Sequence, residues 1–150
     1  MPQVPASIVP SLVLSIALLS FPSPALAGDE IVAAVSAHER VAHDKAVLID
    51  IRQPEEWRQT GMAEDAIGIS MQQPGGARAF LEAVLDAVDG DKQAPIVLIC
   101  RTGNRTSQVV RALREWGFDN VQHVAEGMLG SRHGAGWIAT GLPVEECQVC

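Results

Sequence analysis

The sequence predicts an α/β fold, in which a parallel sheet carries helices on both faces. Short apolar runs of strand length alternate with amphipathic segments of helix length along the chain. The run at residues 95–100 is apolar on both faces, which is typical of a central parallel strand. Apolar residues make up 47% of the chain and charged residues 19%, the balance of a folded domain.

The individual elements follow from the spacing of the apolar side chains. We expect helices at residues 29–45, 78–88 and 106–116. We expect strands at residues 46–51, 66–70, 95–100 and 121–125. Strands separated by helices imply βαβ units, which build a parallel sheet covered on both faces. No repeat or interior linker breaks this order, so the length predicts one domain.

The first 28 residues carry no charged side chain. An apolar run at residues 8–19 precedes two prolines and the sequence Ala25-Leu26-Ala27, which together resemble a secretory signal peptide, although Lys and Arg are missing before the run. We therefore expect residues 1–27 to be removed on export to the periplasm or outside, leaving a single domain of residues 28–150. An uncleaved anchor is the alternative, but the run is shorter than the roughly 20 apolar residues of a spanning helix.

The chain has 18 acidic and 11 basic side chains, a net charge of −7. Nucleic acid is therefore not expected as a partner, because no positive surplus exists to neutralise phosphates. Three cysteines are too few for a disulfide scaffold. The segment 100–114 departs from the acidic character of the chain, because it has four arginines and no acidic residue. This segment suits an anionic ligand.

The candidate site lies where the strand at residues 95–100 ends. Ligands of open α/β sheets bind outside the carboxyl ends of the strands. Cys100 ends the strand, and a helix follows after five polar or glycine residues, so loop N–H groups and the helix dipole can stabilise a thiolate. We predict Cys100 as the catalytic nucleophile and the following residues as substrate-binding: Arg101, Thr102, Gly103, Asn104 and Arg105. An inert buried cysteine beside a solvated basic helix is the alternative.

Motifs along the chain resemble the single-domain rhodaneses. They are LIDIR (48–52), PEEW (54–57), PIVLICRTGNRTS (95–107) and EGM…GW…GLPV (126–144), so the resemblance is strongest over residues 46–144. The C-R-x-G-x-R loop is the most specific part and is typical of the thiosulfate-using branch. The resemblance implies a five-stranded parallel sheet flanked by helices, a persulfide-forming Cys100, and pocket-lining arginines at 101 and 105. It also matches Asp50 to a family acid, which we interpret as structural.

The activity that the resemblance implies is a sulfurtransferase reaction in two displacements. The Cys100 thiolate takes the outer sulfur of thiosulfate or a similar anionic donor, and a thiophilic acceptor, cyanide or a thiol, removes it. This is covalent catalysis with ping-pong kinetics, and it requires neither a metal nor an organic cofactor. A tyrosine-phosphatase loop is disfavoured, because its arginine would stand six positions after the cysteine, where this chain has Thr106.

The tail at residues 145–150 adds a C-x-x-C pair, Cys147 and Cys150. No second pair exists to complete a zinc site, so we expect a small disulfide in an oxidising compartment. In the sharper alternative, one of these thiols attacks the Cys100 persulfide. A second class of function follows from it: an exported thiol-redox or sulfur-binding module that uses Cys100 and the pair, with a redox partner protein.

Three further expectations concern the surroundings of the loop. Thr106 or Ser107 is expected to cap the helix after the loop. The glycine-rich segment 130–137 is a candidate flap beside the pocket, with His133 as a candidate proton donor. His123 carries no functional signal in the sequence.

Overall fold

The computed structural model describes residue 1 and residues 30–147. At its centre lies a five-stranded sheet with the order β1-β6-β5-β2-β4, in which every pairing is parallel. The strands are β1 Ile31–Val32, β2 Val47–Asp50, β4 Ile67–Gly68, β5 Ile96–Ile99 and β6 Val121–Val124. The predicted parallel α/β fold is confirmed.

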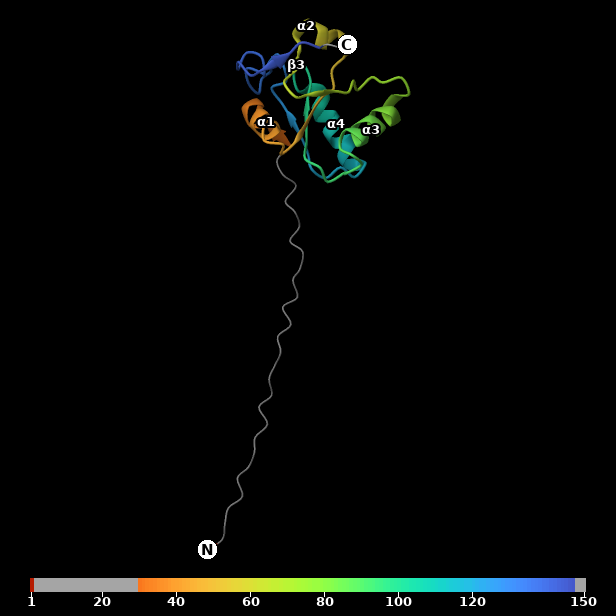
Figure 1. Cartoon of the computed structure of the whole chain (residues 1–150), viewed down its shortest axis with the longest axis vertical. Coiled ribbons are helices and arrows are strands. Elements are labelled where there is room, and N and C mark those ends of the chain that lie inside the picture. Colours follow the sequence, from red (N-terminus) through yellow and green to blue (C-terminus); the bar gives the residue numbers. More distant parts are fainter. Residues whose placement is uncertain (2–29, 148–150) are drawn as a thin grey trace.

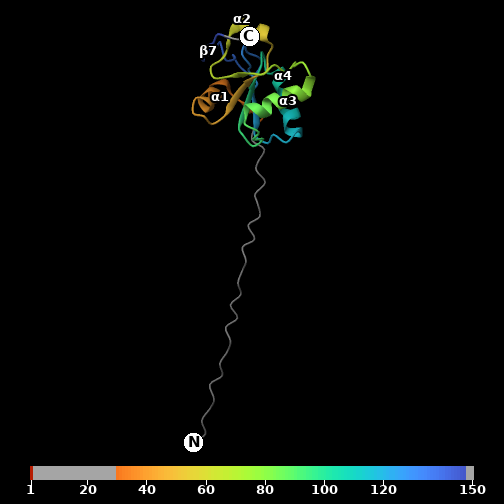
Figure 2. The ribbon, with the colours of Figure 1, turned by 45° about the vertical axis from the view of Figure 1, so that its right-hand side comes forward.

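Helices cover both faces of the sheet. The helices of the described residues are α1 Ala34–Val41, α2 Pro54–Thr60, α3 Gly76–Ala87 and α4 Asn104–Glu115, of which α2 adds no residue to the two cores. Helix α1 lies on one side of the sheet, and α3 and α4 lie together on the other (Figures 1 and 2). Ile49 and Leu98 belong to the core under α3 and α4, whereas their neighbours Leu48 and Val97 belong to the core under α1. This alternation follows from the strand geometry, which points successive side chains to opposite faces.

The first expected helix, residues 29–45, is wrong at its start. Residues Ile31–Val32 form β1 and pair in parallel with β6, and α1 begins only at Ala34. β-branched side chains suit a strand, but the pairing that selects it is a contact with a segment about 90 residues later, which local periodicity does not report. Strand β1 is the fifth strand that the family resemblance implies.

Two antiparallel strands, β3 Met62–Ala63 and β7 Val144–Glu145, form a small second sheet. Neither strand was predicted, nor was α2, because all three are too short to show a period. The sheet holds the C-terminal segment against the end of α2. Trp137 supports it, since this fully buried indole donates its N–H to the carbonyl of Pro143 at 2.8 Å.

The predicted signal peptide lies outside the described residues, apart from Met1, and so does Cys150. Within the described part of the chain, no helix is long and apolar enough to cross a membrane. Cys147 is disulfide-bonded, and Cys100 is a free thiol. In this structure Cys100 is therefore not joined to the tail.

Candidate active site

The cysteine loop, residues 100–105, runs from the carboxyl end of β5 into α4. Strand β5 pairs with both β2 and β6, and all four of its residues are buried. Cys100 follows directly and is 1% exposed. The predicted nucleophile thus lies at the carboxyl edge of the central strand, where α/β proteins bind their ligands.

Two glycines allow the loop to pack tightly on the chain that follows β6. Gly103 has a φ of +80°, and a Cβ there would collide with the carbonyl of Ala125. Gly127 has a φ of +68°, and its Cβ would collide with the carbonyl of Arg101. Side chains are excluded at both positions by conformation and by space, so the loop lies backbone against backbone.

Hydrogen bonds orient the loop so that its carbonyls are already occupied. The N–H of Met128 donates to the Cys100 carbonyl at 2.9 Å, and that of Leu129 donates to the Arg101 carbonyl at 3.0 Å. The backbone N–H groups of residues 101–105, by contrast, donate to no other residue that the structure describes. Such free N–H groups next to a helix N-terminus provide donors for an anion.

The expected side-chain cap of α4 is wrong. Gly103 occupies the N-cap position. The Thr106 hydroxyl donates to the Gly103 carbonyl at 2.9 Å, and the Ser107 hydroxyl donates to the Asn104 carbonyl at 2.9 Å. Both hydroxyls therefore bond carbonyls rather than accept from the helix N–H groups, which stay available to a ligand.

The two loop arginines differ in their surroundings. Arg105 forms a bidentate ion pair with Glu56 of α2, with both N···O distances at 2.7 Å, whereas Arg101 is exposed. The hydrogen bonds from Arg105 lower the pKa of Glu56 against the opposing effect of burial, and those to Glu56 raise the pKa of Arg105. Arg105 therefore fixes the end of the loop to α2, and Arg101 remains free to approach an anion from solvent.

A buried guanidinium sets the position of α2. Arg52 is 1% exposed and pairs with the fully buried Asp50 at 2.7 Å. It also donates to the Thr60 hydroxyl at 2.8 Å and to the Gly61 carbonyl at 2.7 Å. Arg52 thus links the end of β2 to the end of α2 and aligns Glu56 with the cysteine loop. Our interpretation of Asp50 as structural agrees with this arrangement.

Sequence reasoning missed the polar groups behind the sulfur. Cys100 Sγ lies 3.6 Å from the Thr106 hydroxyl oxygen, which lies 2.9 Å from Nδ1 of His123. Burial lowers the pKa of His123 from its usual value. The sequence shows only a histidine in a predicted strand at this position, and the structure adds that His123 stands in register with the buried Leu98 of β5.

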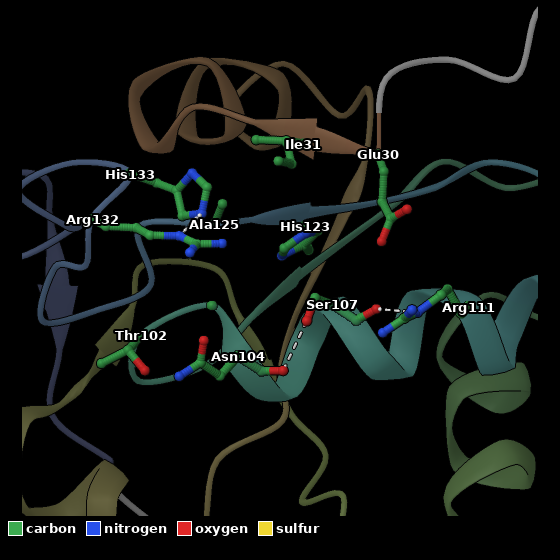
Figure 3. Close-up of a pocket in the computed structure, with 11 residues that line it drawn as sticks. Glu30, Ile31, Thr102, Asn104, Ser107, Arg111, His123, Ala125, Arg132 and His133 are labelled. Atoms are coloured by element: carbon green, nitrogen blue, oxygen red, sulfur yellow. Dashed lines mark hydrogen bonds between the residues drawn. The ribbon is translucent and has the colours of Figure 1, made fainter.

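A cavity of about 350 Å³ lies beside the loop (Figure 3). Its lining includes the predicted residues Thr102, Gly103 and Asn104, together with residues of β6, α4 and the glycine-rich segment, but not Cys100. His133 lines it and accepts a hydrogen bond on Nε2 from Arg132 at 3.2 Å. The role of proton donor that we expect for His133 stays a prediction.

Within residues 30–147, no group of three or more His, Cys, Asp or Glu side chains is arranged to hold a metal ion. The predicted residues do come together in one loop, and the structure adds Glu56, Thr106 and His123 to them. The arrangement is a buried thiol at the start of a loop whose N–H groups have no partner within the described residues, with the exposed Arg101 beside it. It can accept a small anionic electrophile and attack it with sulfur.

Comparisons with known proteins find relatives of the same fold. The family model for the rhodanese-like domain matches residues 33–131. An uncharacterized protein of Rickettsia conorii is 28% identical over 108 residues, which cover 69% of this chain and 85% of that protein. The human single-domain sulfurtransferase superposes with a TM-score of 0.53 at 23% identity, covering 67% of this chain and 92% of the human one. A thiosulfate sulfurtransferase from Pseudomonas aeruginosa gives a TM-score of 0.60 at 20% identity, covering 78% of this chain and 20% of that one.

Proposed function

Because the chain belongs to the rhodanese-like domain family, we propose that it is a sulfurtransferase that carries sulfane sulfur on Cys100. The observation that carries the proposal is the free thiol at the carboxyl end of β5, followed by a loop, residues 101–105, whose N–H groups have no partner within the described chain. The proposed donor is thiosulfate or a similar anion, and the acceptor is cyanide or a thiol. The exposed Arg101 and the loop N–H groups support an anionic donor, since both offer positive charge.

The proposed reaction has two displacements. In the first, the Cys100 thiolate attacks the outer sulfur of thiosulfate, the sulfur–sulfur bond of thiosulfate breaks, and sulfite leaves with the bonding electrons. The enzyme then holds a persulfide. In the second, the acceptor attacks the outer sulfur of the persulfide, and Cys100 leaves as a thiolate. The same N–H donors stabilise negative charge in both steps, so the reaction requires neither metal nor organic cofactor.

The anion-binding roles of the loop divide among its residues. Residues 101–105 contribute N–H groups, and Arg101 contributes charge at the entrance. Arg105 contributes mainly by holding the loop closed on α2, because both ends of its fork are engaged with Glu56. We also propose that the domain works after export, on the basis of the apolar segment and the Ala25-Leu26-Ala27 sequence.

A second candidate function rests on the disulfide at Cys147. In this alternative the chain exchanges thiols with a partner protein, using Cys100 and the tail pair. A redox protein of this kind would give little sulfur transfer, and its activity would depend on the tail cysteines.

Thiocyanate formation from thiosulfate and cyanide separates the two functions. The assay compares the wild type with Cys100→Ser and with the double variant Cys147→Ser/Cys150→Ser. We expect turnover in the wild type and in the double variant, with a ping-pong pattern, and none in Cys100→Ser. Absence of turnover in the reduced, folded wild type would contradict the sulfurtransferase.

A further inference from the structure

Three buried polar side chains connect the reactive sulfur to β6. His123 of β6 is 3% exposed and Thr106 of α4 is fully buried, as is Cys100 at the end of β5. Nδ1 of His123 lies 2.9 Å from the Thr106 oxygen, and the same oxygen lies 3.6 Å from Cys100 Sγ. Buried polar groups that form such a chain are strongly coupled, because the low local polarity strengthens each contact.

The Thr106 hydroxyl has one proton and three neighbours that can accept it. These are the Gly103 carbonyl at 2.9 Å, Nδ1 of His123 and the Cys100 sulfur. A neutral imidazole donates from one nitrogen and accepts at the other. If Nδ1 of His123 lacks a proton, it competes for the hydroxyl proton. If Nδ1 carries a proton, it donates to the Thr106 oxygen and leaves the hydroxyl proton to the other two neighbours.

The Gly103 carbonyl can give up that proton at little cost. The backbone N–H of Ser107 also donates to this carbonyl, at 3.1 Å. The carbonyl therefore keeps a partner when the Thr106 hydroxyl turns away from it. Within the described residues, the Thr106 hydroxyl is the side-chain hydrogen-bond partner of Cys100 Sγ, so a hydroxyl turned toward a thiolate gains a charge-assisted hydrogen bond.

We propose that His123 is a positioning residue for Cys100: its Nδ1–H donates to the Thr106 oxygen and directs the Thr106 hydroxyl proton to the Cys100 thiolate. His123 then acts on the sulfur without touching it. The inference deepens the proposed function, on which it rests for the reaction but not for the state of the thiol. The same hydroxyl can donate to the inner sulfur of the persulfide, which would hold the intermediate in one orientation.

The surroundings of His123 favour a neutral imidazole. Burial lowers its pKa, the nearby His133 and Arg114 lower it further, and Glu30 raises it. The imidazole lies between β6 and α4 at the 350 Å³ cavity, with Arg132 and His133 on one side and Glu30 and Arg111 on the other (Figure 3). A neutral ring near pH 7 has one nitrogen proton to place, and the proposal places it on Nδ1.

The test measures the fraction of Cys100 thiolate by ultraviolet absorbance between about pH 5 and pH 10. Each protein is compared with the same protein carrying Cys100→Ser, so that only this sulfur contributes to the difference. We expect His123→Ala to move the midpoint of the Cys100 thiolate titration upward by roughly one to two pH units, which corresponds to the loss of one hydrogen bond to a charged group. Thr106→Val should give a similar shift, and the double variant should add little to either.

A conservative variant separates the hydrogen bond that His123 donates from the titration and the packing of its ring. In His123→Asn the side-chain amide N–H can occupy the place of Nδ1–H, and we expect it to restore most of the wild-type midpoint. His43→Asn is the matched control, because His43 is exposed and its Nδ1 contacts the Glu39 carbonyl, far from the cysteine loop. It should leave the midpoint unchanged. Circular dichroism of every variant identifies any that fails to fold.

Two results would overturn the inference. One is an unchanged midpoint in folded His123→Ala while Thr106→Val shifts it, which would show that the threonine acts alone. The other is a folded His123→Asn that shifts the midpoint as far as His123→Ala does. The sulfurtransferase proposal fails separately, if wild type forms no thiocyanate while the midpoints move as expected.

Discussion

Replacing Glu56 by glutamine removes a charge from the ion pair that fixes the cysteine loop while keeping the shape of the side chain. The carboxylate accepts two hydrogen bonds of 2.7 Å from Arg105 and one of 3.0 Å from the N–H of Gln53. The side chains of Glu56 and Arg105 are 18% and 29% exposed, so water screens the pair only in part.

The size of the effect follows from these contacts. A hydrogen bond to a charged group contributes about 1.5–3 kcal/mol net. An exposed ion pair contributes at most about 1 kcal/mol, and this pair lies between the two cases. We therefore expect Glu56→Gln to lower the free energy of unfolding by about 2 kcal/mol at pH 7.

The effect should depend on pH in one direction. The pKa of Glu56 is lowered below its usual 4.5 in the folded protein, so the carboxylate stabilises the fold at pH values above the unfolded pKa. This stabilisation is lost as the pH falls through the lowered folded pKa. The difference between wild type and Glu56→Gln should thus be full above about pH 5 and shrink progressively in more acidic buffer.

Urea unfolding at neutral and acidic pH measures the loss of unfolding free energy in Glu56→Gln and its dependence on pH. The matched control is Glu55→Gln, because Glu55 is a neighbour on α2 whose 66%-exposed side chain pairs with Arg58 at 3.2 Å. We expect the control to lose less than about 0.5 kcal/mol. A loss for Glu56→Gln no larger than the control's, or one that stays constant as the pH falls, would refute the reasoning.

Three other substitutions test the scaffold around the site. Asp50→Asn leaves the buried Arg52 without its counter-charge. Urea unfolding should show a free energy of unfolding lower by about 3–5 kcal/mol. Gly103→Ala should abolish most thiocyanate turnover and lower the thermal midpoint of unfolding. The control Gly90→Ala also has a positive φ, +81°, but open space around it, so it should lower the free energy of unfolding by only about 1 kcal/mol and keep turnover. Leu113→Ala, at a fully buried position of α4, should cost about 2–5 kcal/mol while the folded fraction keeps its turnover; lost turnover in folded protein would contradict this.

Sequence reasoning predicted the elements whose apolar patterns are long and local. Strand β5 is a continuous apolar run buried on both faces, and α3 carries a clear apolar stripe, so both were found within a few residues. The sequence pattern predicts helix at β1 because two residues give no strand period, and their pairing with β6 makes them a strand. Contacts between distant segments decide such short elements.

The site was predictable to the extent that its chemistry is contiguous in the chain. Cys100 and residues 101–105 follow one another, and one glycine and two arginines mark the turn. Glu56 and His123 reach the site from α2 and β6, at positions where one sequence shows only a charged helix start and a strand histidine. Their roles depend on side-chain geometry that local patterns do not encode.

The central claim is that Cys100 holds the transferred sulfur. The most direct measurement is the intact mass of the purified protein after incubation with thiosulfate without an acceptor. The account predicts one added sulfur atom on the peptide that contains Cys100, its absence in Cys100→Ser, and its release as thiocyanate when cyanide is added. A reduced, folded protein that gains no sulfur, or a Cys100→Ser variant that still gains it, would contradict the claim.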